Sequence, residues 1–156
     1  MVQEYAPKYS KGMPLGTSQD NGSGIRLGQS VGGRTKHMDR VTAWRFLNPP
    51  MSFAKGMVVN KNGRRFCNEM VYGATLGDEM CENNDGKAYL ILSEELFKSS
   101  KLEAAKSLPF QRDAAKMLMT FNAVKRKNIN DLAKVYDINE DNLKESIHQY
   151  NQSCLL

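Results

Sequence analysis

The residues best suited to contact a ligand through the backbone are Gly22-Ser23-Gly24, at the start of the glycine-rich stretch 22–33, GSGIRLGQSVGG. Glycines that flank a serine at a helix start can point backbone N–H groups outward at a ligand, with Asn21 or Ser23 as the cap. Gly28 would let a strand or a flat ligand approach closely. The stretch equally fits a short helix that stops at the glycine pair 32–33, and glycine content alone favours this simpler interpretation.

Cysteine and histidine offer little chemistry here. The three cysteines, Cys67, Cys81 and Cys154, show no C-x-x-C spacing, and their odd number is unlike a disulfide framework. With two histidines in the chain, we expect no zinc or other metal site. No apolar run approaches the roughly 20 residues of a membrane span, and the first residues lack the apolar core of a secretory signal. We therefore expect a reducing, cytoplasmic location and no membrane span.

Composition indicates a folded chain. Apolar residues make up 40% and charged residues 25% of the 156 positions, enough for one domain with a core or for part of a larger one. The formal charge of +5 is spread along the chain. Its densest basic block, 125–127 (Lys-Arg-Lys), has no interleaved aromatic residue, so we expect a solvated turn and no nucleic-acid binding.

Short apolar runs predict three strands. Residues 57–60 and 64–67 would form a hairpin, joined by a tight turn at the Asn-Lys-Asn-Gly cluster, 60–63. Residues 87–92 are apolar on both faces, so we expect this strand at the centre of its sheet.

A domain boundary is expected near residue 48. Residues 38–47 alternate loosely and suit a strand, but Pro49 and Pro50 cannot donate ladder hydrogen bonds and must interrupt it. We therefore divide the chain into 1–47 and 48–156.

Helical spacing dominates the second half of the chain. In Ala114, Met117, Leu118 and Phe121, apolar residues recur at i, i+3, i+4 and i+7, and we expect this stripe to face the core. Asn128 can cap a further helix. Together with the strands, the pattern predicts an α+β fold, a small sheet with packed helices near 75–83, 111–121, 129–136 and 140–151.

The order of these motifs resembles one protein family. Residues 56–76, GMVVNKNGRRFCNEMVYGATL, resemble a substrate-domain signature in which a G-hydrophobic-V-N strand is followed by G-x-R-F and by an N-E pair. Residues 17–33, 86–93 and 129–151 resemble three more segments of that family, in the same order. The family is that of the fumarate reductase and succinate dehydrogenase flavoproteins, and the pattern is most similar to the FAD-dependent 3-ketosteroid dehydrogenases.

The resemblance implies a two-domain flavoprotein. Residues 1–47 would be a segment of the FAD-binding domain, and 48–156 the substrate (cap) domain. The implied cofactor is FAD, bound by Thr17, Asp20, Gly22, Ser23 and Gly24. The chain lacks the family's G-x-G-x-x-G fingerprint and its closing glycine-rich segment. We therefore expect a fragment that binds FAD weakly or not at all by itself and needs the remaining FAD-domain segments as partners.

Three aligned positions bear on the substrate. Trp44 lies where fumarate reductases have a histidine and Gly73 where they have an arginine, so the resemblance implies no charged cradle for a dicarboxylate. Tyr72 matches a tyrosine of the ketosteroid dehydrogenases, and a phenol can hydrogen-bond an oxygen or accept a proton. We expect Trp44, Tyr72 and Gly73 to bind a steroid-like ketone. Tyr72, or a residue outside this chain, would be the base when the C–C bond beside the ketone is dehydrogenated or reduced.

Other interpretations stay open. Tyr72 could be a half-buried structural residue with its hydroxyl at the surface. The substrate could be a small unsaturated acid such as fumarate or urocanate, with Arg45 or Arg65 as the cation, although both arginines also suit a strand surface. The chain could also be a non-catalytic interaction fragment that contacts its partner through block 125–127.

Overall fold

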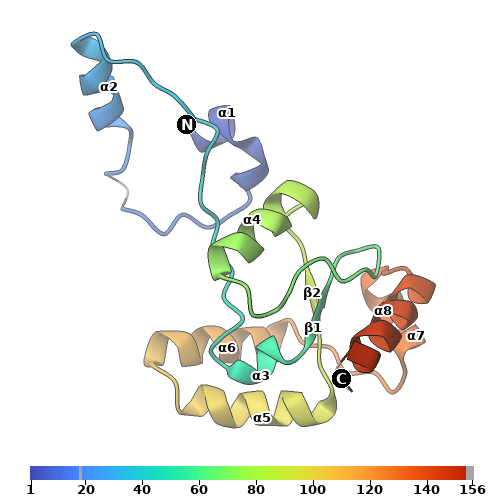
Figure 1. The fold of residues 1–156 in the computed structure, drawn as a ribbon. Helices are drawn as coiled ribbons and strands as arrows, with labels where there is room; N and C mark the ends of the chain where they lie inside the picture. Colours follow the sequence, from blue (N-terminus) through green and yellow to red (C-terminus); the bar gives the residue numbers. More distant parts are fainter. Residues whose placement is uncertain (18, 154–156) are drawn as a thin grey trace.

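A two-stranded antiparallel sheet lies among the helices that follow residue 50 (Figure 1). The computed structural model describes residues 1–17 and 19–153. Strand β1 (Met57–Val59) pairs with β2 (Tyr89–Ile91), with Met57 opposite Ile91 and Val59 opposite Tyr89. Every β1 residue is 3% exposed or less, whereas β2 is half-buried. The fold class is therefore α+β, as the sequence predicts, but the expectation that 87–92 forms a central strand is wrong, because β2 has one partner within the described residues.

The returning strand expected at 64–67 does not form. The tight turn itself is present, with Gly63 at φ +72° and its N–H donated to the Asn60 carbonyl at 2.9 Å. Only one isolated bridge, Val59 to Arg65, then follows. The reason is that the Val58 N–H donates to the carboxylate of Glu69 at 2.8 Å, so a side chain occupies the edge where a second strand would pair.

Helices account for most of the remaining chain. The helices expected near 75–83, 111–121, 129–136 and 140–151 are confirmed within about two residues, the ordinary uncertainty of helix ends. The elements are α1 (Val2–Tyr5), the 3-10 helix η1 (Pro7–Tyr9), α2 (Ser23–Ser30), α3 (Met51–Ala54), α4 (Gly73–Asn83), α5 (Glu94–Ala105), α6 (Pro109–Phe121), α7 (Ile129–Tyr136) and α8 (Glu140–Ser153). Cys154 lies outside the described residues.

One long helix, α5, was not placed by the sequence reasoning. Its start carries a local signal, because Ser93 caps it by accepting the Leu96 N–H at 3.2 Å. Glu94 and Glu95 also occupy the first turn, where the helix dipole favours negative charge. A cap followed by two acids was sufficient to predict this start.

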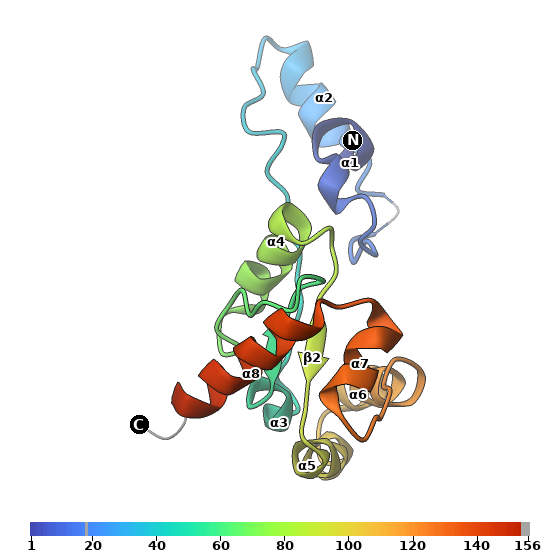
Figure 2. The same cartoon turned by 90° about the vertical axis from the view of Figure 1, so that its right-hand side faces the viewer.

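The core forms where α7 and α8 cover one face of the sheet (Figure 2). Hydrophobic residues from both strands and both helices meet there, and half-buried aromatic rings close its edges. The fully buried members are Met57, Val59, Ala133, Ile138 and Leu143. On the other side, α3 packs on α5, where the Ser52 N–H donates to Glu103 at 2.9 Å.

The prediction of which face of α6 is buried is wrong. Met117 is 59% and Phe121 is 79% exposed, and Ala114 is also at the surface. The buried face is the one with Ala115 and Met119, whose sulfur accepts a hydrogen bond from Ser100 at 3.3 Å. Since α6 packs mainly on α5, a helix with two apolar faces can bury only one of them.

The first 47 residues extend away from the sheet. In Figures 1 and 2, α2 lies at the far end of this segment, well separated from α4. Residues 38–47 contain no strand, contrary to expectation. They run along α4 instead, and a Cβ at Gly77 would come within 2.3 Å of the Ala43 carbonyl oxygen. A segment that lies against a helix cannot also pair with a strand at that position.

Candidate functional site

Three aromatic residues form one exposed cluster, which we call the aromatic cluster: Trp44, Phe46 and Tyr72. The Trp44 ring lies 4.7 Å from that of Tyr72 in an edge-on arrangement and 5.2 Å from that of Phe46. Such ring pairs attract beyond simple burial. All three remain open to solvent, with Tyr72 64% exposed. The structure therefore brings together Trp44 and Tyr72, two of the predicted substrate residues.

Helix α4 positions this cluster. Tyr72 is the N-cap of α4, immediately before its first residue, Gly73. The Arg45 N–H donates to the Gly73 carbonyl at 2.9 Å, which ties the segment with Trp44 and Phe46 to the helix start. A Cβ at Gly73 would lie 3.0 Å from the Phe46 ring, so the glycine allows this close approach. Gly73 thus lies beneath the cluster, while a direct substrate contact by this residue stays a prediction.

Phe46 was missed by the sequence reasoning. It lies two residues after Trp44, and in an extended segment residues i and i+2 point to the same side. That spacing was the available signal.

The Tyr72 hydroxyl is available to a ligand. Among residues 1–17 and 19–153, no group forms a hydrogen bond with it, and its ring is held by Trp44. A phenol held by its ring and open at its oxygen can donate to, or accept from, a bound molecule. The structural alternative, in which Tyr72 is half-buried, does not fit its exposed ring.

Arg65, one of the two arginines considered for binding an acid, is used inside the fold. Its guanidinium donates to Glu69 at 2.6 and 3.0 Å and lies 5.2 Å from the Tyr150 ring. Glu69 is 4% exposed, and the hydrogen bonds to this carboxylate raise the pKa of Arg65. The cation therefore neutralises a buried carboxylate, which would otherwise be costly to bury.

Arg45, the other arginine, lies between Trp44 and Phe46 in the sequence. It lines a shallow depression of about 320 Å³ together with Met80, Gly86, Lys87, Ala88 and Tyr89. Surrounding protein atoms displace water from its guanidinium and lower its pKa. Neither of the two depressions that these arginines line contains Tyr72.

A second depression, of about 480 Å³, includes Arg65 but none of the residues predicted to bind a steroid-like ketone or FAD. It is lined by the segment that follows the 60–63 turn and by α8, through Arg64, Arg65, Phe66, Cys67, Ser146, Gln149, Tyr150 and Ser153. Burial raises the pKa of the Cys67 thiol to about 11. Cys67 is therefore protonated near neutral pH and is a poor nucleophile.

The predicted cofactor residues gather in the turn before α2. Thr17 donates its N–H to Asp20 at 3.1 Å, and Ser23 donates its N–H to the Asn21 side chain at 3.0 Å. The N-cap of α2 is Gly22, so neither Asn21 nor Ser23 holds the expected cap position. Gly22 has φ +77°, and no atom would come within 4 Å of a Cβ at Gly24. Ser18, inside this turn, lies outside the described residues. An exposed helix start with open space at Gly24 fits the edge of a flavin, but nothing in the turn would enclose one.

The predicted FAD-binding residues 17–24 and the aromatic cluster are not brought together. Both views place α2 at one end of the N-terminal segment and α4 against the sheet (Figures 1 and 2).

Within the described residues, no group of three His, Cys, Asp or Glu side chains could hold a metal ion. No helix among those residues is long and apolar enough to cross a membrane.

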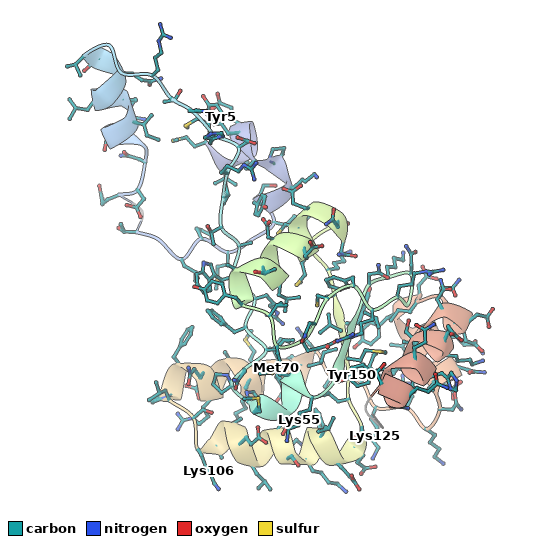
Figure 3. The ribbon with its side chains drawn as sticks, viewed as in Figure 1. Tyr5, Lys55, Met70, Lys106, Lys125 and Tyr150 are labelled. Carbon is teal, nitrogen blue, oxygen red and sulfur yellow. The ribbon has the colours of Figure 1, made fainter. Side chains whose placement is uncertain are left out.

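The basic block 125–127 makes its contacts inside the chain. Lys125 pairs with Glu94 at 2.9 Å, and the Arg126 guanidinium donates to the Lys125 carbonyl at 2.8 Å. Figure 3 shows Lys125 at the edge of the molecule, close to the loop that leads into α5. An exposed pair of this kind contributes little stability and leaves the block accessible.

Comparison with known proteins points to steroid dehydrogenases. No protein-family model matches the chain. A 3-oxo-5-alpha-steroid 4-dehydrogenase of Comamonas testosteroni is 43% identical over 129 residues, which is 81% of this chain and 24% of that protein. The chain thus spans about a quarter of this curated relative.

A solved structure shares the fold. It is a 3-ketosteroid-delta4-(5alpha)-dehydrogenase from Rhodococcus jostii RHA1 in complex with 4-androstene-3,17-dione. The match has a TM-score of 0.73 at 22% identity and covers 97% of this chain and 30% of the other. The chain is therefore related in sequence to a steroid dehydrogenase and folds like part of another.

Proposed function

We propose that this chain forms the substrate-binding side of an FAD-dependent oxidoreductase that dehydrogenates, or reduces, a carbon–carbon bond beside the ketone of a 3-ketosteroid-like substrate. The single observation that carries the proposal is the aromatic cluster, in which the Tyr72 hydroxyl, without a hydrogen-bond partner among the described residues, lies beside the exposed rings of Trp44 and Phe46. The names of the two similar proteins support this substrate class.

The cluster suits a flat apolar ketone. Exposed aromatic faces gain free energy when an apolar ring system covers them. The Tyr72 hydroxyl adds one polar contact without a charge, which matches a carbonyl oxygen or an acidic carbon beside it. A dicarboxylate would instead need arginine, and Arg65 already neutralises Glu69.

Residues 17–24 would contact one edge of FAD, which supplies the two-electron acceptor when bound. The donors available there are the N–H groups of the first turn of α2 that follow Ser23, whose own N–H bonds Asn21, and the hydroxyls of Thr17 and Ser23. The described residues of this turn are exposed, apart from the partly buried Gly22, so the remaining FAD-domain segments must supply most of the site. In the complete enzyme, Tyr72 would take or hold the proton while Trp44 and Phe46 orient the substrate and exclude water.

The proposal is tested by substrate choice in the complete enzyme. Purified flavin-loaded protein would be assayed with 3-ketosteroids of the androstenedione type and, in parallel, with fumarate and urocanate. We expect turnover of the ketosteroids only. Turnover restricted to the acids would refute the proposed substrate class.

Binding of FAD to the 156-residue chain alone provides a second test. Titration of the isolated chain with FAD should show weak binding or none, because an open turn offers few contacts to the pyrophosphate. A chain that purifies with one bound FAD would contradict the assignment of residues 1–47 as an incomplete flavin segment.

A further inference from the structure

Residues 7–11 contact α4 and the turn after it through three side chains, which we call the 7–11 anchor: Lys8, Tyr9 and Lys11. Lys8 pairs with Glu82 at 2.5 Å, and Lys11 pairs with Asp85 at 2.6 Å. Between them, the Tyr9 hydroxyl donates to the Asp78 carboxylate. The three partners lie more than 65 residues away in the chain, so the anchor is a tertiary contact rather than a local one.

The burial of Tyr9 distinguishes the anchor from an ordinary surface contact. Tyr9 is 9% exposed, although it belongs to a short 3-10 helix at the margin of the fold. Burial, followed by its hydrogen bond to Asp78, raises the pKa of the Tyr9 hydroxyl, which therefore stays protonated as a donor. The hydrogen bond from Lys8 lowers the pKa of Glu82, and that from Lys11 lowers the pKa of Asp85.

The negative charge of α4 also favours contact with basic residues from another segment. The helix carries Asp78, Glu79 and Glu82 in its second half and no basic residue. Acidic side chains near a helix C-terminus oppose the helix dipole, so they do not stabilise α4 itself. Lys8 and Lys11 supply the missing positive charge from another segment.

The same helix carries Tyr72 at its other end. Tyr72 is the N-cap of α4, and Asp78 and Glu82 follow it by six and ten residues, or about 9 to 15 Å along the axis at 1.5 Å per residue. Nearer the start of the helix, the Ala43 backbone lies against Gly77, and the Arg45 N–H donates a hydrogen bond to the Gly73 carbonyl. Residues from the first 47 thus hold α4 at its start, middle and end.

We propose that the 7–11 anchor is a positioning device that fixes α4, and with it Tyr72, relative to the flavin-side segment, with Tyr9 as its central positioning residue. This inference rests on the proposed function, because it assigns the anchor a purpose through Tyr72. A helix that pivots at its far end displaces its N-cap, and displacement of a reacting group by about 1 Å can cost two orders of magnitude in rate.

The test uses Tyr9→Phe, which removes one hydroxyl, and the charge reversal Lys8→Glu with its rescue, Lys8→Glu combined with Glu82→Lys. Lys144→Glu is the matched control, since Lys144 forms a solvent-exposed pair with Glu140 at 2.6 Å on α8. The structural readout is the fluorescence of Trp44, the single tryptophan of this chain, whose ring contacts Tyr72. The functional readout is kcat and KM of the complete enzyme.

We expect Tyr9→Phe and Lys8→Glu to shift Trp44 emission to longer wavelength and to increase its quenching by iodide, because the ring loses its contact with Tyr72. In the complete enzyme, kcat should fall roughly tenfold or more, with a smaller change in KM. The double variant should recover both readouts, and Lys144→Glu should leave both unchanged. If Tyr9→Phe fails to fold, Lys8→Glu and its rescue carry the test, since both side chains are exposed.

Failure of the anchor can be told apart from failure of the proposed function. Unchanged Trp44 fluorescence in folded Tyr9→Phe and Lys8→Glu proteins would overturn the anchor, whatever the enzyme does. Shifted fluorescence with normal kcat would overturn its positioning role. Failure of the proposed function would appear instead as turnover of fumarate or urocanate only by the unchanged enzyme, in which the anchor is intact.

Discussion

Two pairs of aromatic rings in this molecule have similar ring separations and different surroundings. Tyr89 and Tyr136 lie 5.2 Å apart and pack against the core, whereas Trp44 and Tyr72 lie 4.7 Å apart in solvent. The Tyr136 hydroxyl donates to the Asn122 carbonyl at 3.0 Å, while no described residue bonds to the Tyr72 hydroxyl. The difference shows that the hydroxyl and its exposure, rather than the ring contact, mark Tyr72 as a candidate for chemistry.

The largest effect is expected on the core side. Leu143→Ala removes a fully buried side chain between α8 and the sheet, where neighbours can collapse only in part. It should lower the free energy of unfolding by about 2 to 5 kcal/mol, measured by urea denaturation.

Phe46→Ala is the matched change on the exposed side. Phe46 is 56% exposed, so its replacement should cost much less stability than that of Leu143. Equal losses in the two variants would show that the aromatic cluster is a structural unit, which would weaken its assignment as a site.

The next effect concerns activity. Tyr72→Phe keeps the ring against Trp44 and removes only the hydroxyl, so the complete enzyme should stay folded and flavin-loaded. If the hydroxyl transfers a proton, kcat on a 3-ketosteroid should fall about a hundredfold or more. Tyr136→Phe removes a hydroxyl of the core pair and should leave kcat within a few-fold. A similar small change in both would remove Tyr72 from the reaction.

A smaller effect on stability is expected when the helical glycines Gly77 and Gly28 are each replaced by alanine. Gly77→Ala places a Cβ 2.3 Å from the Ala43 carbonyl oxygen, so the segment that carries Trp44 must move away from α4. This should cost about 1 to 3 kcal/mol of unfolding free energy and change Trp44 fluorescence.

Gly28→Ala, in α2, is its counterpart. A Cβ there has no neighbour within 4 Å, and alanine favours the helix by about 0.5 to 1 kcal/mol over glycine. The isolated chain should therefore be as stable as before or slightly more so. Destabilisation by Gly28→Ala would show that α2 packs on something in this chain.

The smallest effect is a pH dependence on the core side. Hydrogen bonds from Ser52 hold the pKa of Glu103 below its ordinary value of 4.5. A carboxyl whose pKa is lowered on folding stabilises the fold above its unfolded pKa, and this contribution disappears as pH falls below 4.5.

This dependence is measured by denaturation between about pH 6 and pH 3. Glu103→Gln should lose part of the slope in that range and already be weaker near neutral pH. Glu145→Gln, an exposed residue in the middle of α8, should follow the unchanged protein. Identical slopes in all three proteins would show that the Ser52 contact contributes nothing to stability.

Much of the local structure was predictable from the sequence because its causes are local. The Asn128 side chain accepts the Asp131 N–H at 2.8 Å, as a helix cap should, and α7 starts directly after it. Gly63 closes the turn of 60–63 with a positive φ, which its neighbours could adopt only with strain. The resemblance also placed Trp44 and Tyr72 near a common site, and the structure puts their rings in contact.

Long-range competition decided the rest. Residues 64–67 have the pattern of a strand, yet the Glu69 carboxylate takes the Val58 N–H that this strand would need. The α6 sequence has two apolar faces, and only packing against α5 selects the one with Ala115. The sequence by itself thus determined caps, turns and most helices, which depend on neighbours in the chain. The tertiary structure decided strand partners, the buried face of α6 and the anchoring of α4, because these depend on which distant groups satisfy each hydrogen bond and charge.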